Sequence, residues 1–315
     1  MSTRNLAALV LLAAIWGSSY LFIRVAVDPL GPLMVAFARV GTAGLGLAGY
    51  ALLTGKRKDL AGLDRRFLML GLGNAAVPYV LIAFAELHLT ASMAGILNAT
   101  TPLFAAVVVA VWSHERITPR VSLGIVLGIA GVAVLVGWNP GPLTGIVLLA
   151  VVAMLLSSLS YAVTTVYAKR SLRGVSSLRA AMGQQIGAAV LLGPFTAGAA
   201  AAGAGEGAPS LKVVLAVLAL GLLCTSFAYL LYFHLIAAVG PVNTASTTFL
   251  IPVFSIIWSA IFLDEAIRPV MVLGLAIILC SVTLVTGQQV PGIHRRLIRF
   301  RRGDMPGDQG PGTAT

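Results

Sequence analysis

Long apolar stretches alternate with short polar connections along almost the whole of this 315-residue chain. Each stretch is about 20 residues long, which is the length that an α-helix needs to cross the hydrocarbon core of a bilayer. Charged residues gather in the connections, as expected of a chain that crosses a membrane repeatedly. The pattern predicts ten spans, at residues 5–27, 33–53, 67–87, 92–112, 119–137, 143–168, 177–202, 211–234, 241–263 and 269–287.

The sequence pattern of the fourth span and the residues that follow it is repeated at the ninth span. NATTPLFAAVVVAVWSHERITP starts at Asn98, and TFLIPVFSIIWSAIFLDEAIRP starts 150 positions later at Thr248. Both copies have a proline inside the apolar stretch, an acidic residue at its end and a proline that opens the next span. Self-similarity of this kind indicates a duplicated chain. The matched positions are Gly71 and Gly221, Tyr79 and Tyr229, Pro102 and Pro252, Glu115 and Glu265, and Pro119 and Pro269.

Each copy holds five spans, and an odd number makes the second copy enter the membrane in the opposite direction. We therefore predict an all-α polytopic membrane protein with ten transmembrane helices, arranged as two inverted five-helix repeats. The first repeat is expected at 1–138 and the second at 143–287, followed by a basic, disordered cytoplasmic tail at 288–315. Inverted repeats are typical of secondary transporters, whose solute site lies near the midplane between the halves.

Composition excludes a soluble protein. Only 10% of the residues are charged and 58% are hydrophobic, whereas a soluble domain is about 25% charged. Seventeen of the 21 Lys and Arg residues fall on the connections that share a side with the N-terminus, and two fall on the other side. The positive-inside rule then predicts that both termini are cytoplasmic. We expect a multi-pass protein of the cell (inner) membrane. The net charge of +11 thus reports orientation and indicates no nucleic-acid partner.

Several motifs together resemble the drug/metabolite transporter (DMT) superfamily, EamA type. They are WGSSY from Trp16 to Tyr20, the Pro32 to Arg39 segment, NATTPLF with HERITP, and the doubled five-span unit. The resemblance covers about residues 5–287 and implies a ten-helix inverted repeat that moves small metabolites, often outward, by alternating access. It says nothing of the substrate. The second half departs from the pattern, because Ser157 and Ser158 stand where the first half has Trp16 and Gly17.

Polar and aromatic side chains in mid-span are candidates for the solute site. Trp16, Ser19 and Tyr20 share one helical face, and Tyr161 takes the place of Tyr20 in the second half. A proline removes a backbone hydrogen bond, so Pro102 and Pro252 are predicted helix kinks that free polar groups for a cavity. The alternative for all these residues is helix packing. The predicted substrate-binding residues are Trp16, Ser19, Tyr79, Asn98, Tyr161, Tyr229 and Thr248.

Ionisable groups inside a membrane are costly and mark functional sites by default. Arg39 lies in the second span and Glu86 ends the third, so we expect a charged gate or coupling site at the outer side. Gln185 takes the place of Arg39 in the second half and, with His234, predicts a neutral inner gate. The alternative is that Arg39 reaches the headgroups and Glu86 is solvated. Glu115 and Glu265 are expected to be neutralised by the adjacent Arg116 and Arg268.

The sequence predicts a secondary transporter, an exporter, for a small polar or amphipathic metabolite that is uncharged or zwitterionic, amino acids among them. A passive channel or facilitator for neutral solutes is the alternative, and an intramembrane transferase lacks a deep catalytic acid or base. No enzyme, ATP or metal motif is present, so no cofactor is expected. The expected partners are the small-molecule substrate and the lipid bilayer. Proton or ion coupling, the direction of net flux and the oligomeric state are left open.

Overall fold

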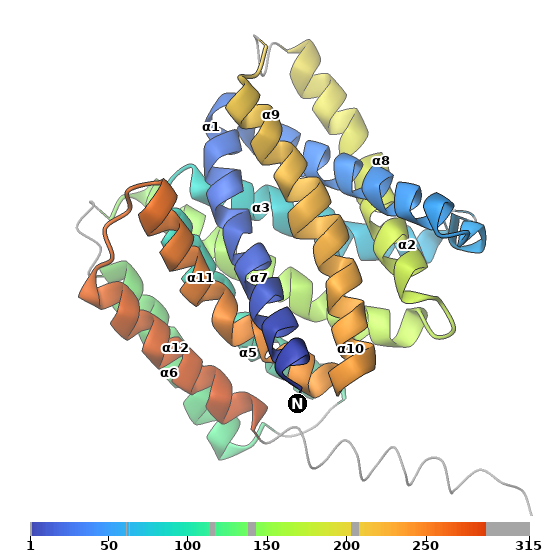
Figure 1. Cartoon of the computed structure of the whole chain (residues 1–315). Helices are drawn as coiled ribbons and strands as arrows, with labels where there is room; N and C mark the ends of the chain where they lie inside the picture. The colour runs from blue at the N-terminus through green and yellow to red at the C-terminus, as the bar shows by residue number, and fades with distance from the viewer. Residues whose placement is uncertain are drawn as a thin grey trace, which may run out of the picture.

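The structure is a computed structural model that describes residues 2–60, 62, 64–113, 117–137, 143–202 and 208–287. Within these ranges every regular element is a helix, and the helices form one bundle (Figure 1). The α-helices are α1 (Thr3–Leu53), α2 (Arg65–Gly71), α3 (Val77–Glu86), α4 (Ala91–Asn98), α5 (Thr101–Trp112), α6 (Pro119–Gly137), α7 (Gly145–Ser171), α8 (Ser177–Ala201), α9 (Leu211–Leu218), α10 (Ala228–Ala245), α11 (Thr247–Phe262) and α12 (Pro269–Thr286). A 3₁₀ turn, η1 (Arg57–Leu60), and two π-helical segments, η2 (Leu72–Ala76) and η3 (Ala219–Phe227), complete the set.

Eight helical stretches in the described part of the chain are long and apolar enough to cross a membrane. One of them, α1, has 51 residues and is two helices joined at Gly31, whose φ of 75° is a conformation that favours glycine. α8 has 25 residues but is not among the eight, because Gln184 and Gln185 lower its mean hydropathy. The eight stretches are Thr3–Leu53, Arg65–Glu86, Ala91–Trp112, Pro119–Gly137, Gly145–Ser171, Leu211–Gly240, Asn243–Phe262 and Pro269–Thr286.

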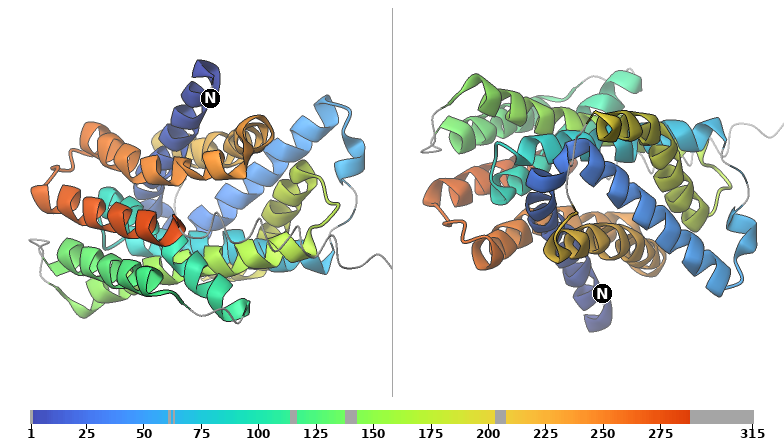
Figure 2. Two further views of the ribbon diagram at one scale, coloured as in Figure 1. Left: turned by 90° about the horizontal axis from the view of Figure 1, so that it is seen from below. Right: turned by 90° about the horizontal axis from the view of Figure 1, so that it is seen from above.

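Helices from the two halves of the chain pack on one another throughout the bundle. The pair α6 and α12 lies along one edge (Figures 1 and 2), where a Cβ added at Gly124 would lie 3.2 Å from the Ser281 carbonyl oxygen. α1 packs against α8, η3 and α11, which all belong to the second half. The N-terminus and the end of α12 lie towards the same end of the molecule (Figure 1). The main cluster of buried apolar residues accordingly contains residues of both halves.

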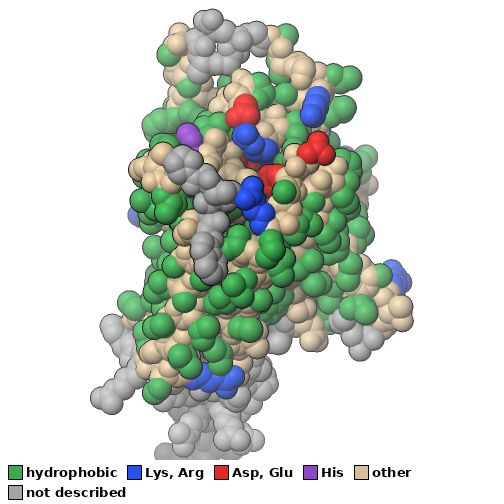
Figure 3. All heavy atoms as spheres, turned by 90° about the vertical axis from the view of Figure 1, so that its left-hand side faces the viewer, with side chains coloured by type: hydrophobic (Ala, Val, Ile, Leu, Met, Phe, Trp, Pro, Cys, Tyr) green, Lys and Arg blue, Asp and Glu red, His purple; other side chains and the backbone are tan. Residues whose placement is uncertain are grey.

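Apolar side chains cover much of the outer surface, as a lipid-facing protein requires. Leu45, Leu53, Ile129 and Phe195 are among the large hydrophobic residues that are highly exposed. Figure 3 shows green apolar side chains over the middle of one face and charged ones gathered towards its upper part and at the bottom. In a membrane protein this apolar belt faces the hydrocarbon.

The two prolines behave differently. Pro252 lies inside α11, whereas Pro102 lies in the first turn of α5 after an interruption at Ala99 and Thr100. The prediction of a kink within one continuous helix is thus corrected for Pro102. Thr100 Oγ1 donates to the Leu97 carbonyl and Thr101 Oγ1 to the Asn98 carbonyl, both at 2.7 Å, so hydroxyls replace the amides that would have continued α4. Glu115, Arg116 and the basic tail lie outside the described residues.

The π-helical segments occupy matching places in the two halves. η2 covers Leu72–Ala76, and the residues 150 positions later fall inside η3. In η3 a side chain also bonds at the five-residue spacing of a π turn: Thr225 Oγ1 donates to the Leu220 carbonyl at 2.8 Å. Single π turns inside α-helices often lie at functional sites.

Candidate functional site

A cavity of about 360 Å³ lies among helices of both halves. Its volume falls within the range of small-molecule sites. The wall is mostly apolar and aromatic, with hydroxyls, amides and one charged side chain. The lining residues are Trp16, Ser19, Tyr20, Ile23, Arg39, Asn74, Tyr79, Ile82, Asn98, Thr101, Tyr161, Thr165, Cys224, Tyr229, Tyr232, Thr244, Ala245, Thr248 and Ile251.

The structure brings all seven predicted substrate-binding residues to the wall of this cavity, as it does Arg39, which we had expected at a gate. The set from the sequence was incomplete, because Asn74, Thr101 and Thr165 also line it. Asn74 and Thr165 stand in apolar runs with no neighbouring signal, whereas Thr101 lies within the repeated NATTP motif. The duplication could have found Asn74 and Thr101, because five lining residues of the first half recur 150 positions later as lining residues of the second. The pairs are Asn74 and Cys224, Tyr79 and Tyr229, Ile82 and Tyr232, Asn98 and Thr248, and Thr101 and Ile251.

Arg39 is held inside the cavity wall by two contacts. Its guanidinium carbon lies 3.9 Å from the centroid of the Tyr79 ring, and its Nε donates to Thr225 Oγ1 at 3.1 Å. The residue is only 7% exposed. No ion pair joins it to Glu86 within the part of the chain that the structure describes. Arg39 therefore neither reaches the headgroups nor pairs with an acid.

Amide and hydroxyl groups complete the polar part of the wall. Asn74 Nδ2 donates to Gln184 Oε1 at 2.8 Å and to the Tyr229 hydroxyl at 3.4 Å, which links the two halves. Asn98 Oδ1 and Ser19 Oγ are buried and have no hydrogen-bond partner among the described residues. Buried polar atoms without partners are costly. Both oxygens have almost no accessible surface, so they do not face the open part of the cavity.

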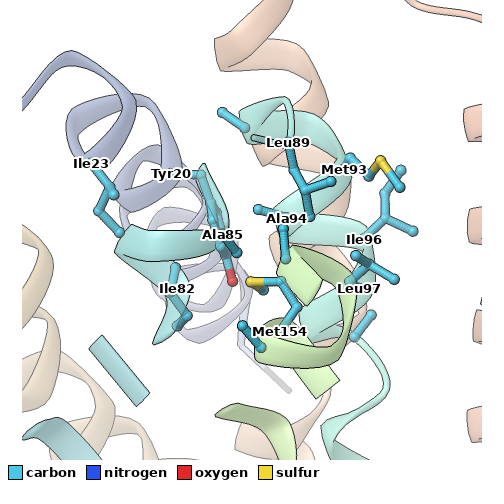
Figure 4. Packing of buried hydrophobic residues seen from close by; sticks show 14 of the residues in the cluster. Tyr20, Ile23, Ile82, Ala85, Leu89, Met93, Ala94, Ile96, Leu97 and Met154 are labelled. Atoms are coloured by element: carbon cyan, nitrogen blue, oxygen red, sulfur yellow. The ribbon is translucent and has the colours of Figure 1, made fainter. Parts of the chain in front are cut away.

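One end of the cavity is closed by apolar packing. Tyr20, Ile23 and Ile82 line it and also belong to the buried core cluster. Figure 4 shows this cluster continuing from α1 and α3 to α4 and α7, where Met93 and Met154 are labelled. The helix α1 passes through this cluster before it reaches Gly31. The closed end of the cavity therefore lies on the same side as the bend at Gly31. We call it the bend end.

A carboxylate joins the two halves beyond this cluster. Glu265, between α11 and α12, accepts hydrogen bonds from the Ala91 amide at 2.8 Å and from the Ser92 amide and hydroxyl at 3.1 and 2.6 Å. It thereby caps the first turn of α4, where an anion is favoured by the helix dipole. No ion pair with Arg268 is present in the described residues, so the expected neutralisation of Glu265 is replaced by this capping contact.

Glu86 lies at the bend end and is completely buried. Its side chain is 0% exposed, so the alternative that it is solvated is wrong, and neither carboxyl oxygen has a partner in the described structure. Arg24 Nη1 donates at 3.1 Å to the Glu86 backbone carbonyl and pairs at 3.1 Å with Asp28. A carboxyl group in this position is unusual, because burial without partners strongly disfavours the ionised form.

The opposite end of the cavity is accessible. Of the lining residues, Thr165 and Ala245 are exposed, and Ala245 ends α10 next to the N-terminus (Figure 1). Gln185 does not line the cavity; it is 0% exposed, and neither atom of its amide has a partner among the described residues. His234 is exposed and also lies off the cavity wall. The structure thus does not bring the two residues of the expected inner gate to the cavity.

Comparison with known proteins gives a consistent picture. The model of the EamA-like transporter family matches residues 4–137 and again residues 148–287. The uncharacterized inner membrane transporter YedA of Escherichia coli is 30% identical over 281 residues, covering 89% of each chain. A probable terminal-alkyne amino-acid exporter of Streptantibioticus cattleyicolor is 24% identical and covers 95% of this chain and 97% of its own. One solved crystal structure, 18% identical with a TM-score of 0.62 over 94% of this chain and 99% of its own, has the same fold.

Proposed function

Because the chain belongs to the EamA-like transporter family, we propose that it is a secondary transporter that exports a small polar or amphipathic metabolite by alternating access. The observation that carries the proposal is the cavity between the halves, closed at the bend end, accessible at the other and lined by equivalent positions of both halves. A carrier needs such a site with one closed end. The relative that is a probable amino-acid exporter supports an amino-acid-like solute.

We propose ten transmembrane helices in two inverted five-helix units, at 1–138 and 143–287. The division of α1 at Gly31 and the length of α8 support two spans beyond the eight apolar stretches. Both described ends lie towards the same end of the molecule (Figure 1), which fits an even number of crossings. The distribution of Lys and Arg supports a cytoplasmic location for that end, so the bend end would face outwards. Gln185 and His234 stay proposals for the inner gate.

The proposed function is tested in two steps. Metabolite profiles of the medium from overexpressing and deletion cells should differ in the exported solute. Purified protein in proteoliposomes should then show accelerated exchange when the same solute is present on both sides. A passive channel would conduct the solute without acceleration, and absence of any protein-dependent flux would exclude both functions.

We further propose that Glu86 carries a coupling proton. The charged groups around it are Arg24 and Arg39 on α1 and Glu265 beyond α4, with His88 two residues further on; α7 brings no charged side chain to this end in the described structure. While the bend end is closed, the acid form fits the unpartnered site, and opening would admit water and release the proton. Uptake on one side and release on the other would couple the proton to the solute.

Glu86→Gln is therefore expected to retain solute exchange and to lose its response to an imposed pH gradient, because glutamine mimics the acid form permanently. Uptake into proteoliposomes with and without a gradient measures the response. Asp28→Asn is the matched control, since Asp28 is an exposed carboxylate at the same end and should leave the response intact. A Glu86→Gln variant that still accelerates transport with the gradient as the wild type does would rule out this role.

A further inference from the structure

Arg39 is a buried cation that no acid neutralises in the described structure. Its side chain lies in the cavity wall, and it forms no ion pair with Glu86 or with any other acidic residue of the described part. An unpaired charge in a membrane interior is expensive and persists where it has a function. The cost would fall if a ligand supplied the missing negative charge.

The surroundings of Arg39 fix the guanidinium and leave one part of it free. Tyr79 covers one face of the group, and Thr225 takes the Nε hydrogen. Thr225 is itself held by the Leu220 carbonyl across the π turn of η3. The two terminal nitrogens make no hydrogen bond within the described residues. Their parallel N–H groups match the two oxygens of a carboxylate, which is the strongest geometry for such a pair.

We propose that the transported solute carries one carboxylate, which binds the terminal nitrogens of Arg39. The proposal rests on the transport function proposed above and adds the chemical class of the solute. The body of the solute would lie against the aromatic wall, where the Trp16 and Tyr232 rings are tilted by 48° with their centroids 5.4 Å apart. A monocarboxylate with an apolar or aromatic side chain fits these two features.

Phosphorylated and polyanionic solutes fit less well. Arg39 is the single charged residue among the lining residues, and no lysine of the described part reaches the cavity. A phosphate group would leave at least one charge without a partner in a poorly hydrated site.

The test uses matched probes on the full-length protein in lipid nanodiscs. L-phenylalanine, L-leucine and L-methionine are each compared with the corresponding amino-acid amide, which keeps the side chain and the amino group and lacks the carboxylate. Binding is measured by calorimetry. For at least one pair, the acid is expected to bind at least about tenfold more tightly than the amide, because one charged hydrogen-bonded pair is lost.

Variants distinguish loss of the contact between the carboxylate and Arg39 from general effects on folding. Arg39→Gln should abolish the preference for the acid, and Arg39→Lys should keep only part of it, because lysine cannot form the paired contact. Arg179→Gln is the matched control: Arg179 also lies over an aromatic ring, 5.5 Å from that of Phe67, but off the cavity wall, and the preference should persist. The wild-type comparison of acids with amides needs no variant and stands if Arg39→Gln fails to fold.

The outcomes are distinct from those of the transport test. Equal binding of acids and amides, no binding of any acid, or an acid preference that survives in Arg39→Gln would each overturn the carboxylate anchor. Accelerated exchange of a neutral or cationic solute would then still leave the transporter function standing. Absence of all exchange in proteoliposomes would remove the transport function itself.

Discussion

Replacing Glu265 with alanine is expected to destabilise the closed bend end of the cavity. The population of the state in which this end is open to water should rise about 100-fold. The change removes three hydrogen bonds to an ionised carboxylate, those from the Ala91 and Ser92 amides and the Ser92 hydroxyl. Bonds of this kind contribute about 1.5–3 kcal/mol each, and they overlap when they share one group. A net loss of about 3 kcal/mol corresponds to roughly two powers of ten in the population of the open state.

Cysteine labelling measures this population. In a Cys280→Ser background, Cys224 is the remaining thiol, and it lines the cavity. A membrane-impermeant maleimide added on the bend side should label Glu265→Ala about 100-fold faster than the parent. Asp264→Asn is the control, because Asp264 is exposed beside Glu265 and its φ of 54° suits asparagine equally well. Equal labelling rates in Glu265→Ala and the parent would show that the carboxylate does not hold this end closed.

The sequence suggests why the bend end is the closed one. The residues 150 positions after Ala91 and Ser92 are Pro241 and Val242. Proline has no amide hydrogen and valine no hydroxyl, so this pair offers one donor where Ala91 and Ser92 offer three. Glu115, the equivalent of Glu265, lies outside the described residues. An equivalent clamp at the other end would thus be much weaker, and the resting protein should close at the bend end.

Gly71→Ala is expected to destabilise the whole fold by about 3 kcal/mol or more. An added Cβ would lie 2.6 Å from both the Ala188 nitrogen and the Gln184 carbonyl oxygen, where α2 meets α8. Both are backbone atoms of a helix, so the clash cannot be relieved by a side-chain rotation, and overpacking of this kind is costly. We expect a sharply lower melting temperature in detergent and loss of the monodisperse peak in size-exclusion chromatography.

Gly41→Ala is the matched control for this prediction. An added Cβ at Gly41 would meet nothing within 4 Å, and the position lies inside α1. Alanine there should be neutral or stabilising by up to about 1 kcal/mol, because glycine is the poorer helix former. A Gly71→Ala protein as stable as Gly41→Ala would contradict the close packing of α2 and α8.

Much of the candidate site followed from the sequence because the duplication marks it twice. Tyr79 and Tyr229 were found together, as were Asn98 and Thr248, since a residue kept at the same place in two apolar spans stands out. Hydropathy likewise located the helices, because the bilayer imposes their length. What could not be derived were contacts between distant segments. Glu265 meets Ala91 across 174 positions, a distance that no local pattern encodes.

The position of Arg39 shows a second limit. Its place in the sequence predicted a charged gate at the outer side, with contact to the headgroups as the alternative, but the side chain turns into the protein to meet Thr225. That contact depends on the π turn of η3, and a π turn has no hydropathy signature. Similarly, Pro102 predicted a bend, while Thr100 and Thr101 produced an interruption, because their hydroxyls compete with the backbone.

The paired π turns also have a consequence for changes in chain length. Each turn contains one residue more than an ordinary α-turn. Deletion of a single residue from η2 or η3 could therefore be absorbed by conversion to α-helix, and the segment would still span the bilayer. Because the deleted residue is the extra one of the π turn, the residues beyond it would keep their facing, and Tyr79 or Tyr229 would stay on the cavity wall. The same deletion in an ordinary α-helical turn would rotate everything beyond it by about 100°. These two places are therefore where the chain can lose a residue and still keep its binding surface.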